Sequence, residues 1–309
     1  MAEEPRGMDA AAGIRAELVA VVVAVTGGTT GAAFPRVLAG GRPPALPSGP
    51  LRTDHDSLQE GARAFVRDQT GATLGYVEQL YTFADLGRTD DAVREISISY
   101  LGLTRADDEQ DGWASIYDLL PWEDRRHLAD DAPADRLTQE IHTALGRWAG
   151  PDVARQERVA YQFGLGGAGW RSELALQRYE LLWEAGLVLE SPCGTGALSL
   201  TGPAMKGDHR RILATALSRL RSRLQYRPLV FELMDADFTL GQLQEVVEAI
   251  GGVRVHKQNF RRAIATQELV EPTGRSTRST GGRPAALYRF RRDVLTEREQ
   301  AGTKLPLPR

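Results

Sequence analysis

The sequence predicts an α+β protein in which an α/β/α sandwich is followed by a helical insertion and a C-terminal winged helix-turn-helix. In the first 120 residues, strand-like apolar segments surround one amphipathic helix, a mixture that favours a sandwich. Residues 121–204 lack strand alternation and carry apolar residues at helical spacing. Residues 239–291 contain two helical patterns around a glycine pair, followed by two strand patterns. We therefore divide the chain into residues 1–120, 121–204, 205–226 and 227–309.

Composition and cysteine usage indicate a soluble protein of a reducing compartment. The 309 residues are 42% hydrophobic and 26% charged, as is typical of globular proteins. The single cysteine, Cys193, excludes an internal disulfide. The longest early apolar run, Leu18 to Val25, is too short to cross a bilayer. We therefore expect a cytoplasmic protein with no membrane partner and no bound metal.

The net charge of -3 hides an uneven distribution. From Thr201 onward there are about 20 Lys and Arg against about 11 Asp and Glu, which leaves about +9 on this part and about -12 on residues 1–200. A basic C-terminal part on an acidic body indicates a polyanionic partner for that part alone. The alternative is a surface whose charge is uneven by chance.

The first part of the chain predicts four strands. Ala16 to Val25 is rich in valine and predicts a buried strand, with Phe34 to Ala39 as the second strand of a hairpin. Tyr76 to Ala84 follows as a third strand. In the fourth, Glu95 to Thr104, apolar and polar residues alternate, which predicts a half-buried strand.

One helix is expected between these strand pairs, over residues 56–71. Ser57 is a suitable N-cap, and Glu60 stands at the capping-box position three residues later. Gly71 is expected to end the helix.

The segment LPSGPLRTDHDSLQEGARAFVRDQTGA, residues 46–72, resembles a Nudix box, G-x5-E-x7-R-E-U-x-E-E-x-G-U with U aliphatic. Gly49 and Gly71 match its first and last glycines. Asp56 stands one residue late for the first Glu, and residues 64–69 replace the R-E-U-x-E-E core by AFVRDQ.

The missing carboxylates bear on the chemistry that this resemblance implies. Nudix hydrolases hold Mg²⁺ or Mn²⁺ on a pyrophosphate with clustered carboxylates, but Phe65 cannot bind a metal and Gln69 brings no charge. The resemblance therefore implies a Nudix-like fold that is not an enzyme but keeps a nucleotide pocket. The candidate ligand-binding residues are Arg36, Glu60, Asp68 and Tyr100.

Residues 121–226 predict a run of helices. Three are expected in the insertion, over 135–149, 152–163 and 171–185. Met205 to Tyr226 is a long helix that we expect to link two domains. Its apolar stripe contains Ile212, Ala216, Leu217, Leu220 and Leu224, and arginines at 211, 219, 221 and 223 are expected on the opposite side.

The pattern near the C-terminus predicts a winged helix. Thr239 caps the first helix with Gln242 at the capping-box position, and the Gly251–Gly252 pair supplies the turn. The second helix starts near His256, with Phe260 and Ile264 turned inward. Arg, Asn and Lys remain for its outer face, which is the mixture that a recognition helix needs in the major groove. The predicted DNA-binding residues are His256, Lys257, Asn259, Arg261 and Arg262 on the helix and Arg275, Arg278 and Arg283 on the wing.

Longer ordered segments resemble Nudix-related transcriptional regulators of NAD metabolism, the NrtR family. They include residues 208–213, 238–244, 259–262, 269–274 and 282–290. The resemblance covers roughly residues 16–120 and 203–292, and the chain departs from the family at His256, where an Asp is common. The resemblance implies a homodimeric repressor that binds a double-stranded DNA operator and is relieved by an effector, ADP-ribose or a related nucleotide, with no other cofactor.

Three alternatives remain open from the sequence. The chain could be a Nudix hydrolase of ADP-ribose or of another nucleoside diphosphate derivative, against which the residues at 65 and 69 argue. It could also be a nucleotide-sensing adaptor that contacts proteins through its winged helix. Finally, the basic C-terminal part could be a small α/β domain for protein contacts.

Overall fold

The computed structural model describes residues 14–27, 33–85, 94–105, 111–128, 136–193, 201–226, 229–277 and 284–291. A mixed sheet lies at its centre in the order β4-β5-β1-β2-β6, and β3 also pairs with β1, at residues Glu17–Val19. Only the β1–β5 pair is parallel among the pairs of this sheet that the structure describes. The strands are β1 (Ile14–Thr26), β2 (Phe34–Leu38), β3 (Ser48–Pro50), β4 (Tyr76–Phe83), β5 (Arg94–Leu103) and β6 (Trp113–Ser115). The four strands expected from the sequence are confirmed, including the β1–β2 hairpin.

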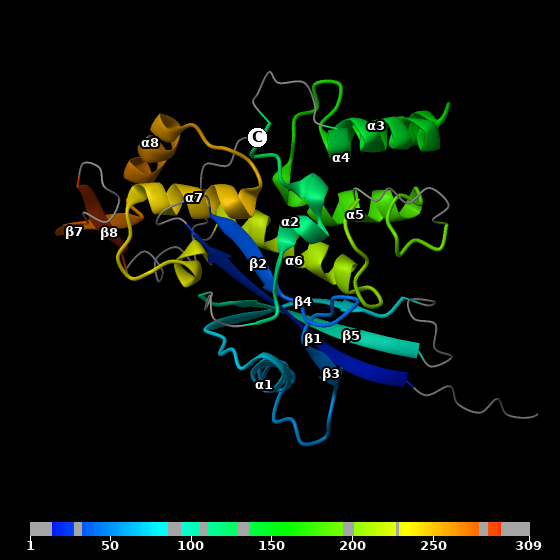
Figure 1. Cartoon of the computed structure of the whole chain (residues 1–309), viewed down its shortest axis with the longest axis horizontal. Helices are drawn as coiled ribbons and strands as arrows, with labels where there is room; N and C mark the ends of the chain where they lie inside the picture. The colour runs from blue at the N-terminus through cyan, green and yellow to red at the C-terminus, as the bar shows by residue number, and fades with distance from the viewer. Residues whose placement is uncertain are drawn as a thin grey trace, which may run out of the picture.

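Strand β1 is buried on both faces because helices cover both sides of the sheet (Figure 1). Val19, Val21 and Val23 belong to the main core, on the side of the larger helical layer. Ala20 and Val22 point to the opposite face, toward α1 (Leu58–Thr70). Both sets follow from the period of two along a strand. The α/β/α sandwich predicted from the sequence is therefore present.

Helix α1 begins and ends where its sequence predicts. The Ser57 hydroxyl accepts a hydrogen bond from the Glu60 N–H (3.1 Å), which satisfies one free donor of the first turn. Gly71 ends the helix in the left-handed region, with φ 73°.

The larger layer contains the helices between residues 116 and 184 and a long central helix. They are α2 (Ile116–Leu119), η1 (Pro121–Glu123), α3 (Arg136–Ala149), α4 (Val153–Phe163), η2 (Ser172–Leu174), α5 (Ala175–Glu184) and α6 (His209–Tyr226). Helix α6 lies between the sheet and α5 (Figure 1). Its predicted apolar stripe is buried, but Arg210 and Arg221 are fully buried as well. The expectation that Arg221 lies on an outward-facing side is wrong, because α6 is covered on more than one side.

The winged helix follows and shares its core with the body. It comprises η4 (Leu229–Leu233), α7 (Leu240–Gly251), α8 (Lys257–Gln267), β7 (Val270–Thr277) and β8 (Ala285–Phe290). The Thr239–Gln242 capping box is formed with both hydrogen bonds, of 3.2 and 2.8 Å. Buried side chains of α7 and α8 belong to the same cluster as those of β1, α5 and α6. Within the described residues, no helix is long and apolar enough to cross a membrane.

Candidate nucleic-acid interface

Helix α8 presents a polar and basic outer face. Phe260 and Ile264 are 0% and 2% exposed and fix the helix against the core, as the helical spacing predicts. The predicted recognition residues are all exposed: His256 at the N-cap, and Lys257, Asn259, Arg261 and Arg262 on the helix. The His256 side chain makes no capping hydrogen bond, so its ring does not stabilise the end of the helix.

The wing strands carry a further predicted cation. Arg275 lies on β7, its side chain 66% exposed, and it forms an ion pair with Asp237 in the segment before α7. Arg278 and Arg283 lie outside the described residues. Arg289 on β8 pairs with Glu271 on β7 (2.7 Å), which joins the two wing strands on their exposed side.

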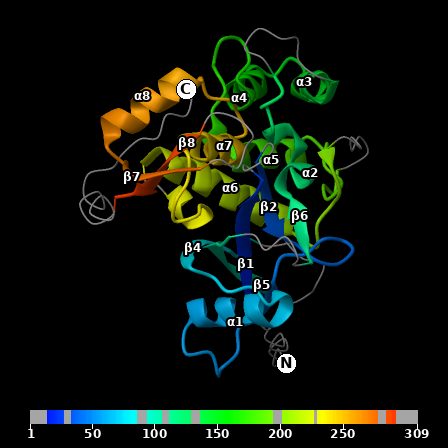
Figure 2. The ribbon, with the colours of Figure 1, turned by 60° about the vertical axis from the view of Figure 1, so that its left-hand side comes forward.

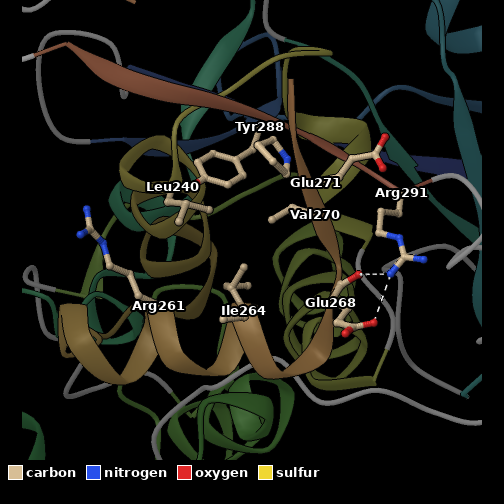
Figure 3. Close-up of a pocket in the computed structure, with 10 residues that line it drawn as sticks. Leu240, Arg261, Ile264, Glu268, Val270, Glu271, Tyr288 and Arg291 are labelled. Carbon is tan, nitrogen blue, oxygen red and sulfur yellow. Dashed lines mark hydrogen bonds and ion pairs between the residues drawn. The ribbon is translucent and has the colours of Figure 1, made fainter. Parts of the chain in front are cut away.

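A groove of about 490 Å³ separates α8 from the wing (Figure 3). Leu240, Ile264 and Val270 form its apolar wall and Tyr288 covers one side, while Arg261 lines its other end. Arg291 donates to the Glu268 carbonyl oxygen (3.4 Å) and pairs with its carboxylate (3.3 Å). This pair connects the end of α8 to the residue that follows β8. Neither the groove nor the pair was expected from the sequence, because the β7–β8 hairpin is what brings their residues together.

The structure spreads the four candidate nucleotide ligands over three elements. Arg36 on β2 donates to the Trp113 carbonyl oxygen (3.3 Å). Glu60 and Asp68 are exposed on α1. Tyr100 on β5 is 5% exposed and packs with Leu18 and Ala62 under α1, and burial raises the pKa of its hydroxyl. This packing is sufficient to explain the buried position of the Tyr100 side chain without a bound ligand.

The residues at the Nudix metal positions have structural roles. The Phe65 ring lies so close to Gly49 that a Cβ there would collide with it, and it meets the His55 ring edge-on at 5.5 Å. The Gln69 amide donates to the Ser48 carbonyl oxygen (2.7 Å) and accepts from the Ser48 N–H (3.2 Å). Both side chains thus hold α1 against β3 and its flanks. They do not fit a divalent cation, which requires several oxygen ligands, with carboxylates among them.

The same segment of α1 keeps one carboxylate, that of Asp68. Asp68 is exposed and lies beside Arg67 (3.3 Å). Among the residues that the structure describes, no group of three or more His, Cys, Asp or Glu side chains is placed to hold a metal ion.

Comparisons with known proteins give a family model that matches the C-terminal part, a relative in sequence and structures that share the fold. Residues 230–290 match the family model of the NrtR DNA-binding winged helix domain. Over 83 residues, 27% of this chain and 33% of the relative, the sequence is 41% identical to the ADPR responsive transcriptional repressor NtrR of Acinetobacter baylyi. The matched part thus spans about one third of that relative's length.

Two crystal structures from Shewanella oneidensis are similar over nearly the whole chain. NrtR has a TM-score of 0.53 at 15% identity, with 94% of this chain and 99% of that chain covered. NrtR complexed with a 27mer DNA has a TM-score of 0.50 at 18% identity, with 91% and 95% covered. At these identities the likeness shows the fold alone. The α+β fold with a C-terminal winged helix is confirmed, and so is the resemblance to the NrtR family.

Proposed function

Because its winged helix belongs to the NrtR DNA-binding family, we propose that this chain is a DNA-binding transcriptional repressor of NAD metabolism genes. The observation that carries the proposal is the outer face of α8, where all five predicted recognition residues are exposed on a helix fixed from behind by buried Phe260 and Ile264. A recognition helix has to combine this exposure with a rigid support.

The side chains on this face suit the major groove. Arg261 and Arg262 supply planar donors for guanine or phosphate, and Asn259 supplies the paired donor and acceptor that match adenine. Lys257 at the start of the helix suits a phosphate. Phosphate contacts supply most of the affinity and make it depend steeply on salt.

The proposed assembly is a homodimer on a palindromic operator, with the protein in the cytoplasm. Two recognition helices related by a two-fold axis match two half-sites about one helical turn apart.

The proposed effector is ADP-ribose or a related nucleotide, bound by the sandwich. The name of the Acinetobacter baylyi relative, ADPR responsive, supports this choice for a chain that is 41% identical to it over 83 residues. The roles of Phe65 and Gln69 in holding α1 favour a sandwich that binds a nucleotide without hydrolysing it. A nucleotide relieves repression only if it binds the DNA-free geometry more tightly.

DNA binding is tested by fluorescence anisotropy on DNA from upstream of the chain's own gene, at 50 and 200 mM salt. Asn259→Ala and Arg262→Ala are expected to weaken specific binding by about 1–3 kcal/mol each. Arg67→Ala is the matched control, because Arg67 is 60% exposed on α1, at the opposite end of the molecule from α8 (Figure 2). Absence of specific binding at 50 mM salt overturns the proposal and favours the protein-contact adaptor.

The effector is tested separately by titrating ADP-ribose into the protein alone and into the preformed DNA complex. Release of DNA by ADP-ribose is expected. Binding of ADP-ribose without any change in DNA affinity contradicts the effector role. Mg²⁺-dependent formation of AMP from ADP-ribose contradicts the non-enzymatic role and favours the hydrolase.

A further inference from the structure

The C-terminal end of α7 is held by the body of the protein. The last carbonyl groups of a helix have no partner within the helix and carry partial negative charge. In α7 these groups accept hydrogen bonds from the body. The bonds run from the Tyr117 hydroxyl to Ala249, from Arg221 Nε to Ile250 (2.9 Å) and from the Arg125 N–H to Gly252 (2.7 Å).

Gly252 makes this approach possible. Its φ is 70°, and a Cβ at this position would collide with the Glu123 carbonyl oxygen and lie 3.1 Å from the Tyr117 hydroxyl oxygen. A side chain here would therefore be strained by the backbone and excluded by the body. The glycine of the turn serves the docking of α7 as well as the turn itself.

Arg221 is held in turn by a buried charge cluster. The carboxylate of Glu123 accepts from Arg178 Nε (2.6 Å) and Nη2 (2.7 Å) and from Arg221 Nη1, and all three side chains are 0% exposed. Burial favours the neutral acid, but the two guanidinium groups outweigh it and hold the pKa of Glu123 below its usual value. Glu123 therefore stays ionised and fixes the direction of Arg221.

The helical insertion supplies most of this cluster. Glu123 lies on η1 and Arg178 on α5, and the Ser172 carbonyl oxygen on η2 accepts from Arg221 Nη1 (3.0 Å). Arg221 Nη2 also donates to the Glu123 carbonyl oxygen (3.0 Å). The insertion thus sets the orientation of the arginine that holds α7.

The same contacts continue into one edge of the sheet. Arg36 on β2 pairs in register with Ser115 on β6, two residues before Tyr117. Arg126 lies over the Tyr117 ring (5.2 Å to the centroid) and donates to the Ala33 carbonyl oxygen just before β2 (2.6 Å). The end of α7 therefore connects through a few packed residues to β2, the strand that carries Arg36, a candidate nucleotide-binding residue.

We propose that these contacts form a clamp, made of Tyr117, Glu123, Arg221 and Gly252, through which the body sets the position of the recognition helix. Arg221 and Tyr117 are its positioning residues. Helix α8 begins five residues after Gly252, so a rotation of α7 at the clamp moves α8 with it. The signalling role of the clamp rests on the proposed function, whereas its mechanical role does not.

The mechanical role is tested by hydrogen exchange of the full chain. Tyr117→Phe removes the hydroxyl that binds Ala249, and Arg254→Ala removes an outer contact, Arg254 Nε to the Arg126 carbonyl oxygen (2.7 Å). Both are expected to raise amide exchange over residues 246–255 by at least about fivefold. The control is Arg223→Ala. Arg223 lies on α6, as Arg221 does, but its side chain pairs with Glu78 on β4 (3.0 Å) and not with α7. Exchange within about twofold of the parent chain in both Tyr117→Phe and Arg254→Ala overturns the clamp.

The positioning role needs a readout that packing alone does not move. We take the ratio of the DNA dissociation constants with and without ADP-ribose. In Tyr117→Phe this ratio is expected to fall toward one by at least about threefold, while it is unchanged in Arg223→Ala. Faster exchange with an unchanged ratio overturns the positioning role. A parent chain that binds no DNA, or ignores ADP-ribose, overturns the proposed function, and the exchange measurement still decides the clamp.

Discussion

Replacing Glu123 by Gln tests how much the buried charge cluster contributes to the free energy of unfolding. The carboxylate is fully buried, and its oxygens accept three hydrogen bonds from Arg178 and Arg221. Gln has nearly the same size but no charge, and its amide nitrogen places a donor where an acceptor is needed. One guanidinium donor then faces another donor, and two buried positive charges lose their counter-ion.

The expected loss is large for a single isosteric change. Removing one partner of a buried ion pair costs about 3–5 kcal/mol, because the other charge stays buried and uncompensated. Here two charges are left, which raises the cost. Arg178 keeps carbonyl partners at Gln162 (3.1 Å) and Arg171 (2.8 Å), which lowers it. We therefore expect a loss of about 4 kcal/mol, a considerable part of the roughly 5–15 kcal/mol typical of folded proteins.

Urea unfolding followed by circular dichroism measures this loss, with the slope of the transition as a check that the unfolded state is unchanged. The matched control is Glu184→Gln, which removes an exposed pair with Arg158 (side chains 44% and 38% exposed). The control is expected to lose at most about 1 kcal/mol. A loss below about 1 kcal/mol in Glu123→Gln refutes the reasoning, since it means that the cluster is dispensable or rearranges freely.

The pH dependence of the Glu123 contribution and changes at three other positions supply four further tests. The pKa of Glu123 lies below its usual value, so the ionised carboxylate stabilises the fold fully above the ordinary carboxyl pKa of about 4.3, and this stabilisation is lost as the pH falls through the lowered pKa. The difference in free energy of unfolding between the parent chain and Glu123→Gln is therefore expected to be constant from about pH 5 to 8 and to shrink in acid. Thr239→Ala removes a capping hydrogen bond (3.2 Å) and is expected to lower the free energy of unfolding, measured with urea, by about 1 kcal/mol, whereas Thr239→Ser keeps the bond. Glu268→Gly relieves a left-handed backbone (φ 48°) and is expected to add up to about 1 kcal/mol, and a lower melting temperature contradicts this. Lys257→Ala is expected to reduce the slope of log affinity against log salt by about 1, and Arg67→Ala to leave it unchanged.

Local signals made much of the fold predictable. The caps at Ser57 and Thr239 and the turn at Gly252 depend on neighbours within a few residues, so the sequence alone predicts them correctly. The same holds for Val21 and Phe260, whose burial follows from the spacing of apolar residues along one element. The exposed basic face of α8 was predictable for the same reason.

The buried arginines were not predictable, because their partners are distant in the sequence. Arg221 meets Glu123, 98 residues away, and Arg178 meets the same carboxylate across 55 residues. The spacing of charged residues on α6 is equally compatible with a solvated side, since periodicity does not distinguish a paired buried charge from an exposed one. The same limit applies to the candidate nucleotide-binding residues, because the sequence does not show which of them are buried. Tyr100, which packs under α1, is an example.

The shared core limits how the winged helix can respond to a nucleotide. Leu243, Val247 and Ile250 of α7 are at most 1% exposed, in the cluster that also contains Val37 of β2, and α7 packs against β2 and α6. Exposing three such side chains costs roughly 1.5–3 kcal/mol each, or about 5–9 kcal/mol together. Coupling between two ligand sites is typically about 1–3 kcal/mol, which is too little to separate α7 from the body. A response that keeps this core closed and turns α7 about the clamp at Gly252 requires far less free energy. The physical balance therefore favours a small rotation of α8 over the release of the whole winged helix.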